Sequence, residues 1–457
     1  MNFVNSMGKT LNLKMNANFQ KNLKDNKLLK IYLNYALPSI AAMWVFSIYT
    51  MVDGYFVGKY VSEIALASVN VAMPFVNTVF ALAIILAVGT STKVAILLGE
   101  GKRQNAKELF TFTVIVIICF SLTLALLSRI LLPELTRLLG AEDRLYSYVH
   151  SYLAIIIWFI PFFMISYHFE VLVKIDGFPR LATYGVISAA ITNIFLDWLF
   201  VSEFKWGVEG AALATGIAQL FSALLFTTHF LKDKARLRFV HFDNIREFIK
   251  QLPLIVSLGT GDFLSELSTG FIVFLYNHFL LRSLGESSLV TYTIISYFTL
   301  LIASTMAGLT QGMQPLVSYF YGKHDFDSST KITHYAIKSV VGLSLVALCI
   351  GILFPKQISL FFLSSDSHLL DTTIISIRKY AISYIALGAN LLFVGLLAAN
   401  GDAKKAITLS VLRGFAFVYL ALLFMSNVMP PDYMWYSSTL SEGISLVIGY
   451  FFIRKYL

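Results

Sequence analysis

Charged residues are scarce in this sequence. Asp, Glu, Lys and Arg together make up 13% of the 457 residues, whereas 57% are hydrophobic and 39 are phenylalanines. Soluble globular domains carry about 25% charged residues. The scarcity of charge therefore excludes an ordinary soluble protein and indicates a membrane protein.

Cysteines and catalytic motifs are also few. The only cysteines, Cys119 and Cys349, lie in apolar runs, which excludes a disulfide framework or a cysteine-ligated metal cluster. The sequence contains no Gly-x-x-x-x-Gly-Lys phosphate loop, no His-Glu-x-x-His and no Gly-x-Ser-x-Gly, and its histidines lack metal-ligand spacing. We therefore predict that the protein is not an enzyme, has no cofactor or bound structural metal, and is not driven directly by ATP.

Apolar segments of membrane-spanning length recur along the whole chain. Each is at least as long as the roughly 20 residues that a helix needs to cross a bilayer. Twelve are found, at residues 33–57, 65–98, 109–132, 146–172, 181–202, 208–231, 251–281, 288–320, 332–354, 376–399, 405–427 and 433–453. The sequence therefore predicts an all-α polytopic membrane protein with twelve transmembrane helices.

The basic residues are unequally divided between the loops. Of the 35 Lys and Arg residues, 25 are assigned to the side that holds both termini and 9 to the other, and Lys93 alone is assigned to a span. Cytoplasmic loops carry the excess of basic residues, so both termini are expected in the cytoplasm. The net charge of +9 therefore reflects the membrane topology and gives a weak attraction to anionic lipid. It does not indicate nucleic-acid binding. The first thirty residues lack the pattern of a cleavable signal peptide.

The two halves of the chain look like copies of one another. Matching prolines or glycines occur at the start of spans one and seven, at the end of spans two and eight, and after spans four and ten: Pro38 and Pro253, Gly99 and Gly322, Gly177 and Gly401. Six spans per half give parallel repeats. We predict a basic cytoplasmic lead (1–30), two six-helix lobes (31–231 and 251–457), a cytoplasmic linker (232–250), and a central cavity between the lobes.

Three polar residues are predicted deep in the first lobe. Asp53 lies in the first span, and Asn193 and Asp197 lie one helical turn apart on one side of the fifth. A buried carboxyl favours its protonated form and can release the proton when its surroundings open to water. Acids inside membrane spans are functional candidates by default, although they can also simply bond neighbouring hydroxyls or amides.

Other polar and aromatic residues are weaker candidates. Asp262 and Glu266 lie one turn apart in the seventh span, and Glu170 with Lys174 is expected to form an exposed ion pair. No role is assigned to Glu442. The residues that could either line a cavity or pack between helices are Asn70, Gln311, Gln314, Asn390, Tyr49, Met51, Tyr292 and Met306.

Several segments resemble the multidrug and toxic compound extrusion (MATE) family of transporters, part of a broader superfamily of flippases and exporters. The segments are VDGYFVG at 52–58, ALASVN at 65–70 with Pro74, GEGK at 99–102, Asn193-x-x-x-Asp197, and Gln314-Pro315-Leu316 with Gly322. The resemblance covers the chain after the basic lead. It implies export of bulky, often cationic drugs and dyes in exchange for inward H⁺ or Na⁺.

The resemblance also assigns residues. It places Asp53, Asn193 and Asp197 in an amino-terminal coupling site that could hold H⁺ or Na⁺. In some members an acid of the seventh span matters too, and either Asp262 or Glu266 matches it.

The second lobe departs from the first at the coupling positions. Counting from Gly401 as from Gly177, the equivalents of Asn193 and Asp197 are Phe417 and Ala421. We therefore expect coupling through the first lobe only.

We predict a monomeric secondary antiporter of the cell membrane that works by alternating access, with organic cations as substrates and no nucleic-acid partner. One alternative is a flippase for lipid-linked sugars, which needs several basic residues facing its cavity. All basic residues except Lys93 are predicted in loops or at helix ends, which favours drug export. The other alternative, a channel or receptor, predicts no uphill accumulation of substrate.

Overall fold

The computed structural model describes residues 28–141, 143–242 and 245–457, and these ranges are helical without a strand. Most of the predicted basic lead lies outside the described residues. The first helices are α2 (Leu28–Tyr60), α3 (Glu63–Gly99), α4 (Arg103–Ile130), α5 (Leu132–Leu138), α6 (Asp143–Ile175), α7 (Pro179–Asp197), η1 (Trp198–Glu203) and α8 (Gly207–Phe230). The others are α9 (Ile245–Leu284), α10 (Ser287–Gly322), α11 (Phe326–Leu353), α12 (Pro355–Leu360), α13 (Leu370–Ala381), α14 (Tyr384–Ala399), α15 (Ala403–Val411), η2 (Leu412–Ala416), α16 (Phe417–Val428), η3 (Pro431–Tyr436), α17 (Ser437–Ile453) and η4 (Arg454–Tyr456).

The helices match the predicted membrane spans. In the described ranges, 10 helices are long and apolar enough to cross a bilayer, and α13 with α14 forms an eleventh span bent by 44°. The remaining predicted span corresponds to α17, which has 17 residues. The prediction of an all-α polytopic membrane protein is confirmed.

Sequence signals at the helix ends explain several boundaries. The Ser62 hydroxyl accepts a hydrogen bond from the Ala65 N–H (3.0 Å) and caps the start of α3. Gly177 and Gly401, which correspond in the sequence repeat, both have positive φ values, 98° and 77°. This left-handed conformation favours glycine and ends α6 and α14 in the same way.

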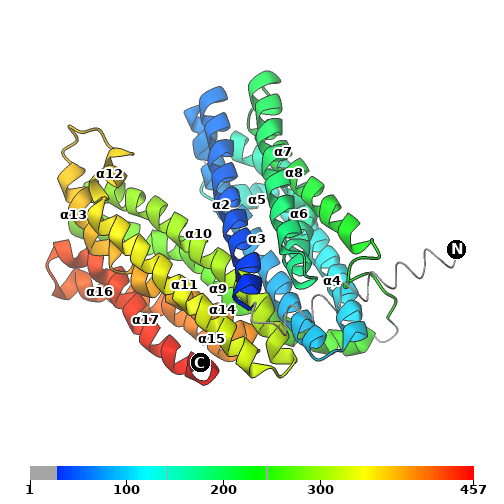
Figure 1. The fold of residues 1–457 in the computed structure, drawn as a ribbon. Helices are drawn as coiled ribbons and strands as arrows, with labels where there is room; N and C mark the ends of the chain where they lie inside the picture. Colours follow the sequence, from blue (N-terminus) through cyan, green and yellow to red (C-terminus); the bar gives the residue numbers. More distant parts are fainter. Residues whose placement is uncertain (1–27, 142, 243–244) are drawn as a thin grey trace.

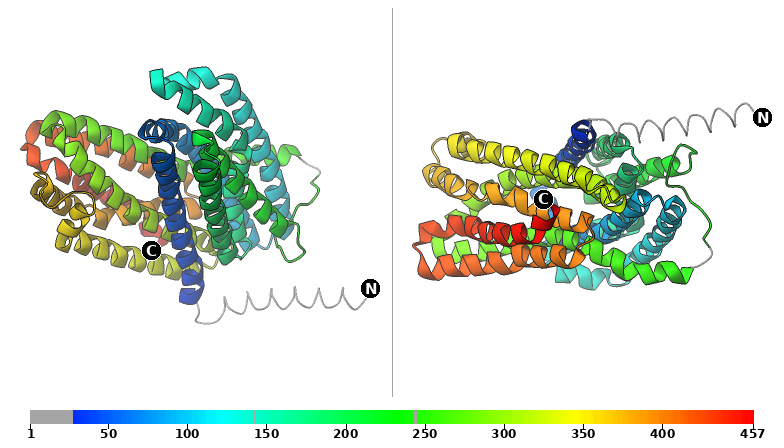
Figure 2. Two further views of the ribbon diagram at one scale, coloured as in Figure 1. Left: turned by 90° about the horizontal axis from the view of Figure 1, so that it is seen from above. Right: turned by 60° about the horizontal axis from the view of Figure 1, so that its bottom comes forward.

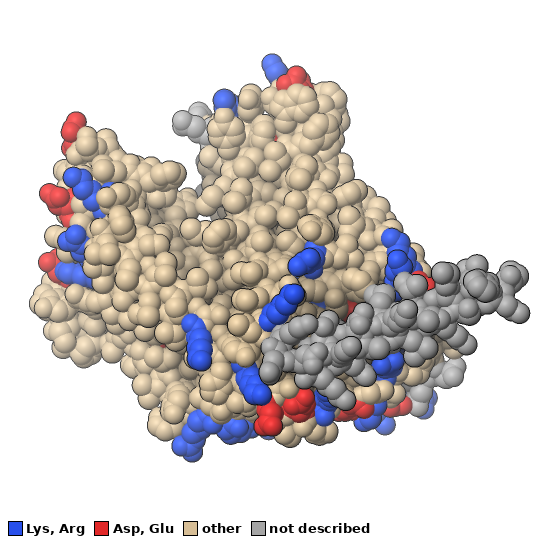
Figure 3. Space-filling model, viewed as in Figure 1, with Lys and Arg blue, Asp and Glu red and all other residues tan. Residues whose placement is uncertain are grey.

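The helices form two bundles that touch at one end and separate at the other (Figure 1). The first bundle contains α2 to α8 and the second contains α9 to α17. Where they touch, α3 packs against α9 and α2 packs against α10, and a view from above places α2 between the two groups (Figure 2). We call the end where the bundles touch the base, and the opposite end, where the surface is hollowed between them (Figure 3), the mouth.

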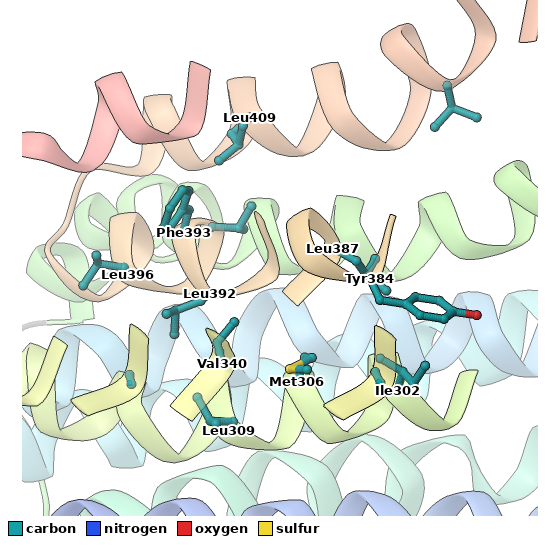
Figure 4. Close-up of a cluster of buried hydrophobic side chains, with 14 of the residues drawn as sticks. Ile302, Met306, Leu309, Val340, Tyr384, Leu387, Leu392, Phe393, Leu396 and Leu409 are labelled. Carbon is teal, nitrogen blue, oxygen red and sulfur yellow. The ribbon is translucent and has the colours of Figure 1, made fainter. Parts of the chain in front are cut away.

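Close packing of apolar side chains fills each bundle. In the second bundle, Met306, Leu309, Val340, Tyr384 and Leu392 belong to one buried cluster contributed by α10, α11 and α14 (Figure 4). Since lipid tails are as apolar as these side chains, the helices are held together mainly by van der Waals packing.

The segment after α8 packs against the first bundle, although it was predicted as a polar linker. The buried Asp176 carboxylate accepts hydrogen bonds from the backbone N–H groups of Arg236 (2.8 Å) and Leu237 (2.7 Å). The same carboxylate lies 2.8 Å from Nε2 of His229. This part of the linker is therefore attached to the first bundle by a buried acid.

Candidate functional site

The three polar residues predicted deep in the first lobe lie buried in the first bundle. Asp53 of α2 is 5% exposed, and Asn193 and Asp197 of α7 are 1% and 0% exposed. The last two are four residues apart in α7, so both project from one side of this helix. The carboxyls of Asp53 and Asp197 are direct neighbours. We call these three residues the carboxyl cluster.

The carboxyl cluster has more oxygen atoms than hydrogen-bond donors. Among the described residues, Oδ1 of Asp53, both carboxyl oxygens of Asp197 and Oδ1 of Asn193 are buried without a hydrogen-bond partner. The Asn193 amide donates to the Thr215 hydroxyl at 3.3 Å. No Lys, Arg or His in the described ranges forms an ion pair with either carboxyl. Buried oxygens without donors are costly, so this arrangement favours the capture of a proton or a small cation.

The backbone changes directly after Asp197. The α-helix ends at this residue and continues as a π-helix over Trp198–Glu203. Such insertions are rare and occur frequently at functional sites, because they alter the direction of the side chains around them.

A small cavity lies beside the carboxyl cluster. It has a volume of about 50 Å³, enough for a few water molecules but not for a drug-sized ligand. Its lining is mostly aromatic and apolar: Ala42, Met43, Phe46, Tyr49, Phe80, Phe163, Ser166, Tyr167, Glu170, Val186, Ala189, Gln219 and Ser222. Tyr49 connects this cavity to the carboxyl cluster, because it also lies near Asp53 and Asp197. Tyr152 is a further neighbour of both acids that the sequence did not indicate.

The ion pair of Glu170 and Lys174 is buried, and its prediction as an exposed pair is wrong. Nζ of Lys174 lies 2.9 Å from Oε1 of Glu170, and the Lys174 side chain is only 2% exposed. Lys174 also donates to Oε1 of Gln311, in the second bundle, at 3.4 Å. The Gln311 amide approaches Sδ of Met43 in α2 at 3.7 Å. Packing of α10 against the first bundle therefore covers a pair that the sequence placed near a helix end.

Acids of the second bundle approach the same region. Asp262 of α9 accepts a hydrogen bond from the Gln314 amide at 3.2 Å. Glu266, one turn further along α9, is exposed. Tyr167, which lines the cavity in the first bundle, lies within electrostatic range of Glu170, Asp262 and Glu266. Carboxylates from both bundles therefore lie near Tyr167.

The remaining candidates lie elsewhere. Asn70 and Met51 are exposed, and Asn390 is buried and bonded to Glu442 (2.6 Å). Tyr292 and Met306 are 3% and 1% exposed and belong to the core of the second bundle, so they pack between helices and do not line the cavity.

A buried ion pair in the second bundle was not predicted. Arg413 in the π-helix η2 donates to Oε2 of Glu442 in α17 at 3.0 Å, and both side chains are 6% exposed. The expectation that every basic residue except Lys93 lies in a loop or at a helix end is therefore wrong for Arg413. The Arg413 guanidinium and the Asn390 NH₂ group both donate to the Glu442 carboxylate here, unlike the acids of the first bundle, which have no basic partner among the described residues.

Comparison with known proteins settles the family. The MatE family model matches residues 38–199 and 263–423, one match in each half of the chain. The protein belongs to the MatE family. This is a family of transporters, and its two matched segments agree with the internal repeat.

Curated MatE relatives and solved structures are similar over most of their lengths. The chain is 23% identical to "Multidrug export protein MepA" of Staphylococcus aureus over 88% of this chain and 87% of the relative. The protein of the same name from Staphylococcus saprophyticus is also 23% identical, with 88% of each chain covered.

Two solved structures show the same fold. One is described as a MOP superfamily transporter from Pyrococcus furiosus, and the other as the outward-facing conformation of a multidrug resistance MATE family transporter. Each has a TM-score of 0.86, is 20% identical, and is covered over 97% of its length by 94% of this chain.

Proposed function

We propose that this MatE protein is a secondary active exporter that moves bulky organic cations out of the cell in exchange for H⁺ or Na⁺. The observation that carries the proposal is the carboxyl cluster, in which two buried acids adjoin one another without a basic partner in the described ranges. Two carboxylates in such surroundings repel one another, so uptake of one positive charge stabilises the pair.

Either coupling ion fits the chemistry of the cluster. A proton can be shared between Asp53 and Asp197, and Na⁺ can be held by their oxygens together with Oδ1 of Asn193. Release of the ion returns the negative charge. The repulsion between Asp53 on α2 and Asp197 on α7 is therefore weak in the ion-bound state and strong in the ion-free state. Ion binding can shift the preferred position of α2 in this way.

The substrate class follows from the cavity and the acids around it. Aromatic rings at Phe46, Tyr49, Phe80, Phe163 and Tyr167 attract organic cations through their π-faces. Among the described residues, the lining includes Glu170 and no Lys or Arg. The curated relatives carry the name multidrug export protein, which supports drug export by this chain.

The cavity must change size during transport. At about 50 Å³ it is smaller than the 300 Å³ or more that a drug-sized ligand requires. We infer that substrate binds after the first bundle rearranges around Tyr49 and enlarges the cavity, or after the cavity joins the space between the bundles. The bias of basic residues supports a cytoplasmic base, and in that orientation the mouth opens to the outside of the cell.

The proposal is tested with purified protein in proteoliposomes. An imposed pH gradient in sodium-free buffer, or a sodium gradient at constant pH, should drive uphill movement of a cationic dye, and the gradient that works identifies the ion. Downhill movement alone would indicate a channel and overturn the proposal. Movement of a lipid-linked sugar without any dye transport would instead indicate a flippase.

A further inference from the structure

A second cavity lies at the base and shares no residue with the first. It is a groove of about 330 Å³ between the end of α3, the start of α4 and the start of α9. Its lining combines basic, amide and apolar side chains: Lys93, Leu97, Lys102, Asn105, Phe248, Gln251 and Leu254. The groove is open to the surroundings of the protein and contacts both bundles.

The depth of the groove follows from the helix contacts. Lys93 lies six residues before Gly99, the last residue of α3, and therefore about 9 Å from that end at 1.5 Å per residue. Gly89 of α3 lies against the backbone of Ile255 in α9. Because the two helices run in opposite directions, one turn toward the base brings Lys93 level with Gln251. A lysine at this depth extends its ammonium toward the lipid phosphates.

The groove has an excess of positive charge at one end. Lys93 is partly exposed and forms no ion pair or hydrogen bond with the residues that the structure describes. Lys102 pairs with Glu100 at 2.8 Å, which leaves the Lys93 charge unbalanced. The side-chain amides of Asn105 and Gln251 add N–H donors.

The other side of the groove is apolar and reaches the lipid. Phe248 and Leu97 are buried in its wall, whereas Leu254 is 44% exposed at its rim. Phe248, Gln251 and Leu254 are spaced three residues apart along α9 and therefore follow one side of that helix. A ligand with an anionic head and an apolar chain matches both parts of this lining.

We propose that the groove binds an anionic phospholipid, with the phosphate at Lys93 and an acyl chain along Leu254. Basic pockets between transmembrane helices on the cytoplasmic side suit such headgroups. A free phosphate ion would use the ammonium and amide groups but leave the apolar wall without a partner. The bound lipid contacts α3 of the first bundle and α9 of the second.

The test is native mass spectrometry of the full chain, titrated separately with phosphatidylglycerol and phosphatidylcholine. The unmodified protein should bind one phosphatidylglycerol in preference to phosphatidylcholine. Lys93→Gln should weaken this binding about fivefold or more, since one basic residue near an anionic lipid contributes about 1 kcal/mol. Lys93→Arg should keep it. Lys404→Gln, which removes the same charge from an exposed site in the second bundle, should bind like the unmodified protein.

Three results would overturn the proposal. Lys93→Gln could bind phosphatidylglycerol as tightly as the unmodified protein, or phosphatidylcholine could bind equally well. Inorganic phosphate could also displace the lipid at an equal concentration, which would indicate a site for free anions. If Lys93→Gln fails to fold, Gln251→Leu tests the same groove, and unchanged lipid binding in that variant would equally count against the site.

Discussion

Gly99 of α3 and Gly322 of α10 lie against each other's helices where the two bundles meet. A β-carbon at Gly99 would clash with the carbonyl oxygen of Tyr319, and one at Gly322 would clash with that of Ile96. These glycines end the second and eighth predicted spans, so equivalent positions of the repeat make the contact from both sides. The base is therefore closed by direct backbone packing, which only residues without a side chain permit.

Gly99→Ala is expected to open the base. The added methyl group overpacks the contact, which typically costs about 1–3 kcal/mol, enough to change the ratio of closed to open molecules at least fivefold. Lys102, directly before α4, and Lys331, on α11, are exposed residues of the first and second bundles. Electron–electron double resonance between spin labels on cysteines introduced at these two positions measures the separation of the bundles, after Cys119 and Cys349 are replaced. The variant should show a longer-distance population that the parent lacks.

The matched control is Gly270→Ala. A β-carbon at Gly270, on α9, would meet no atom within 4 Å. This variant should give the parent distance distribution. If Gly99→Ala also gives the parent distribution, backbone contact at this glycine does not hold the base closed.

The buried pair of Arg413 and Glu442 gives a second prediction. Replacing one partner leaves the other charge buried and unpaired, which costs about 3–5 kcal/mol, whereas replacing both with apolar residues is often neutral. Arg413→Met and Glu442→Leu should each lower the thermal midpoint of the detergent-solubilised protein, and the double variant should recover most of the loss. Single variants as stable as the parent would show that the pair contributes little.

The spans were predictable because the length and hydropathy of a membrane helix are local properties of the sequence. The repeat could be found because glycines such as Gly177 and Gly401 serve the same turn in both halves. The spacing of Asn193 and Asp197 likewise fixed their common side on one helix. Their grouping with Asp53 followed from their common lobe and from the family resemblance.

The missed features depend on contacts between distant helices. Arg413 and Glu442 are 29 residues apart and lie on different helices, so the sequence around one of them does not predict a contact with the other. Lys174 is buried by Gln311, which is 137 residues away. The predicted linker could not reveal that Asp176 would bind the backbone at Arg236 and Leu237. A polar sequence shows that a segment avoids lipid, but not what it packs against.

The buried pair of Glu170 and Lys174 predicts a stability effect and a transport effect that can be separated. Glu170→Gln leaves the Lys174 ammonium buried without its carboxylate partner and should lower the thermal midpoint. Adding Lys174→Gln should restore it. In the restored double variant, export of a cationic dye should show a higher KM because Glu170 lines the cavity. An unchanged KM would remove Glu170 from substrate recognition.

The carboxyl-terminal tail should respond to pH through Asp402. Burial raises the pKa of this carboxyl, but hydrogen bonds from Lys455 and Lys405 outweigh that effect and hold the pKa below its usual 3.8. A carboxyl whose pKa is lowered by folding stabilises the folded state at any pH above its ordinary, unfolded-state pKa. This stabilisation is lost as the pH falls through the pKa of the carboxyl in the folded protein. The interaction should therefore be complete at neutral pH and absent in strong acid.

Hydrogen exchange at Arg454–Tyr456 measures this effect. Asp402→Asn should exchange faster than the parent at neutral pH, and the difference should disappear well below pH 3.8. A difference that stays constant over the whole pH range would show that the charge of Asp402 does not hold the tail.

The most direct test concerns Asp53 of the carboxyl cluster. Proteoliposomes holding equal amounts of folded parent, Asp53→Asn or Asp327→Asn protein are given an outward gradient of H⁺ or Na⁺, with the ion more concentrated inside, and accumulation of a cationic dye in the vesicles is measured. Asp327 is exposed on α11 and controls for the chemical change itself. We predict uphill accumulation by the parent and by Asp327→Asn, and none by Asp53→Asn with either ion. Normal accumulation by Asp53→Asn would contradict the central claim that the buried acids couple ion entry to export.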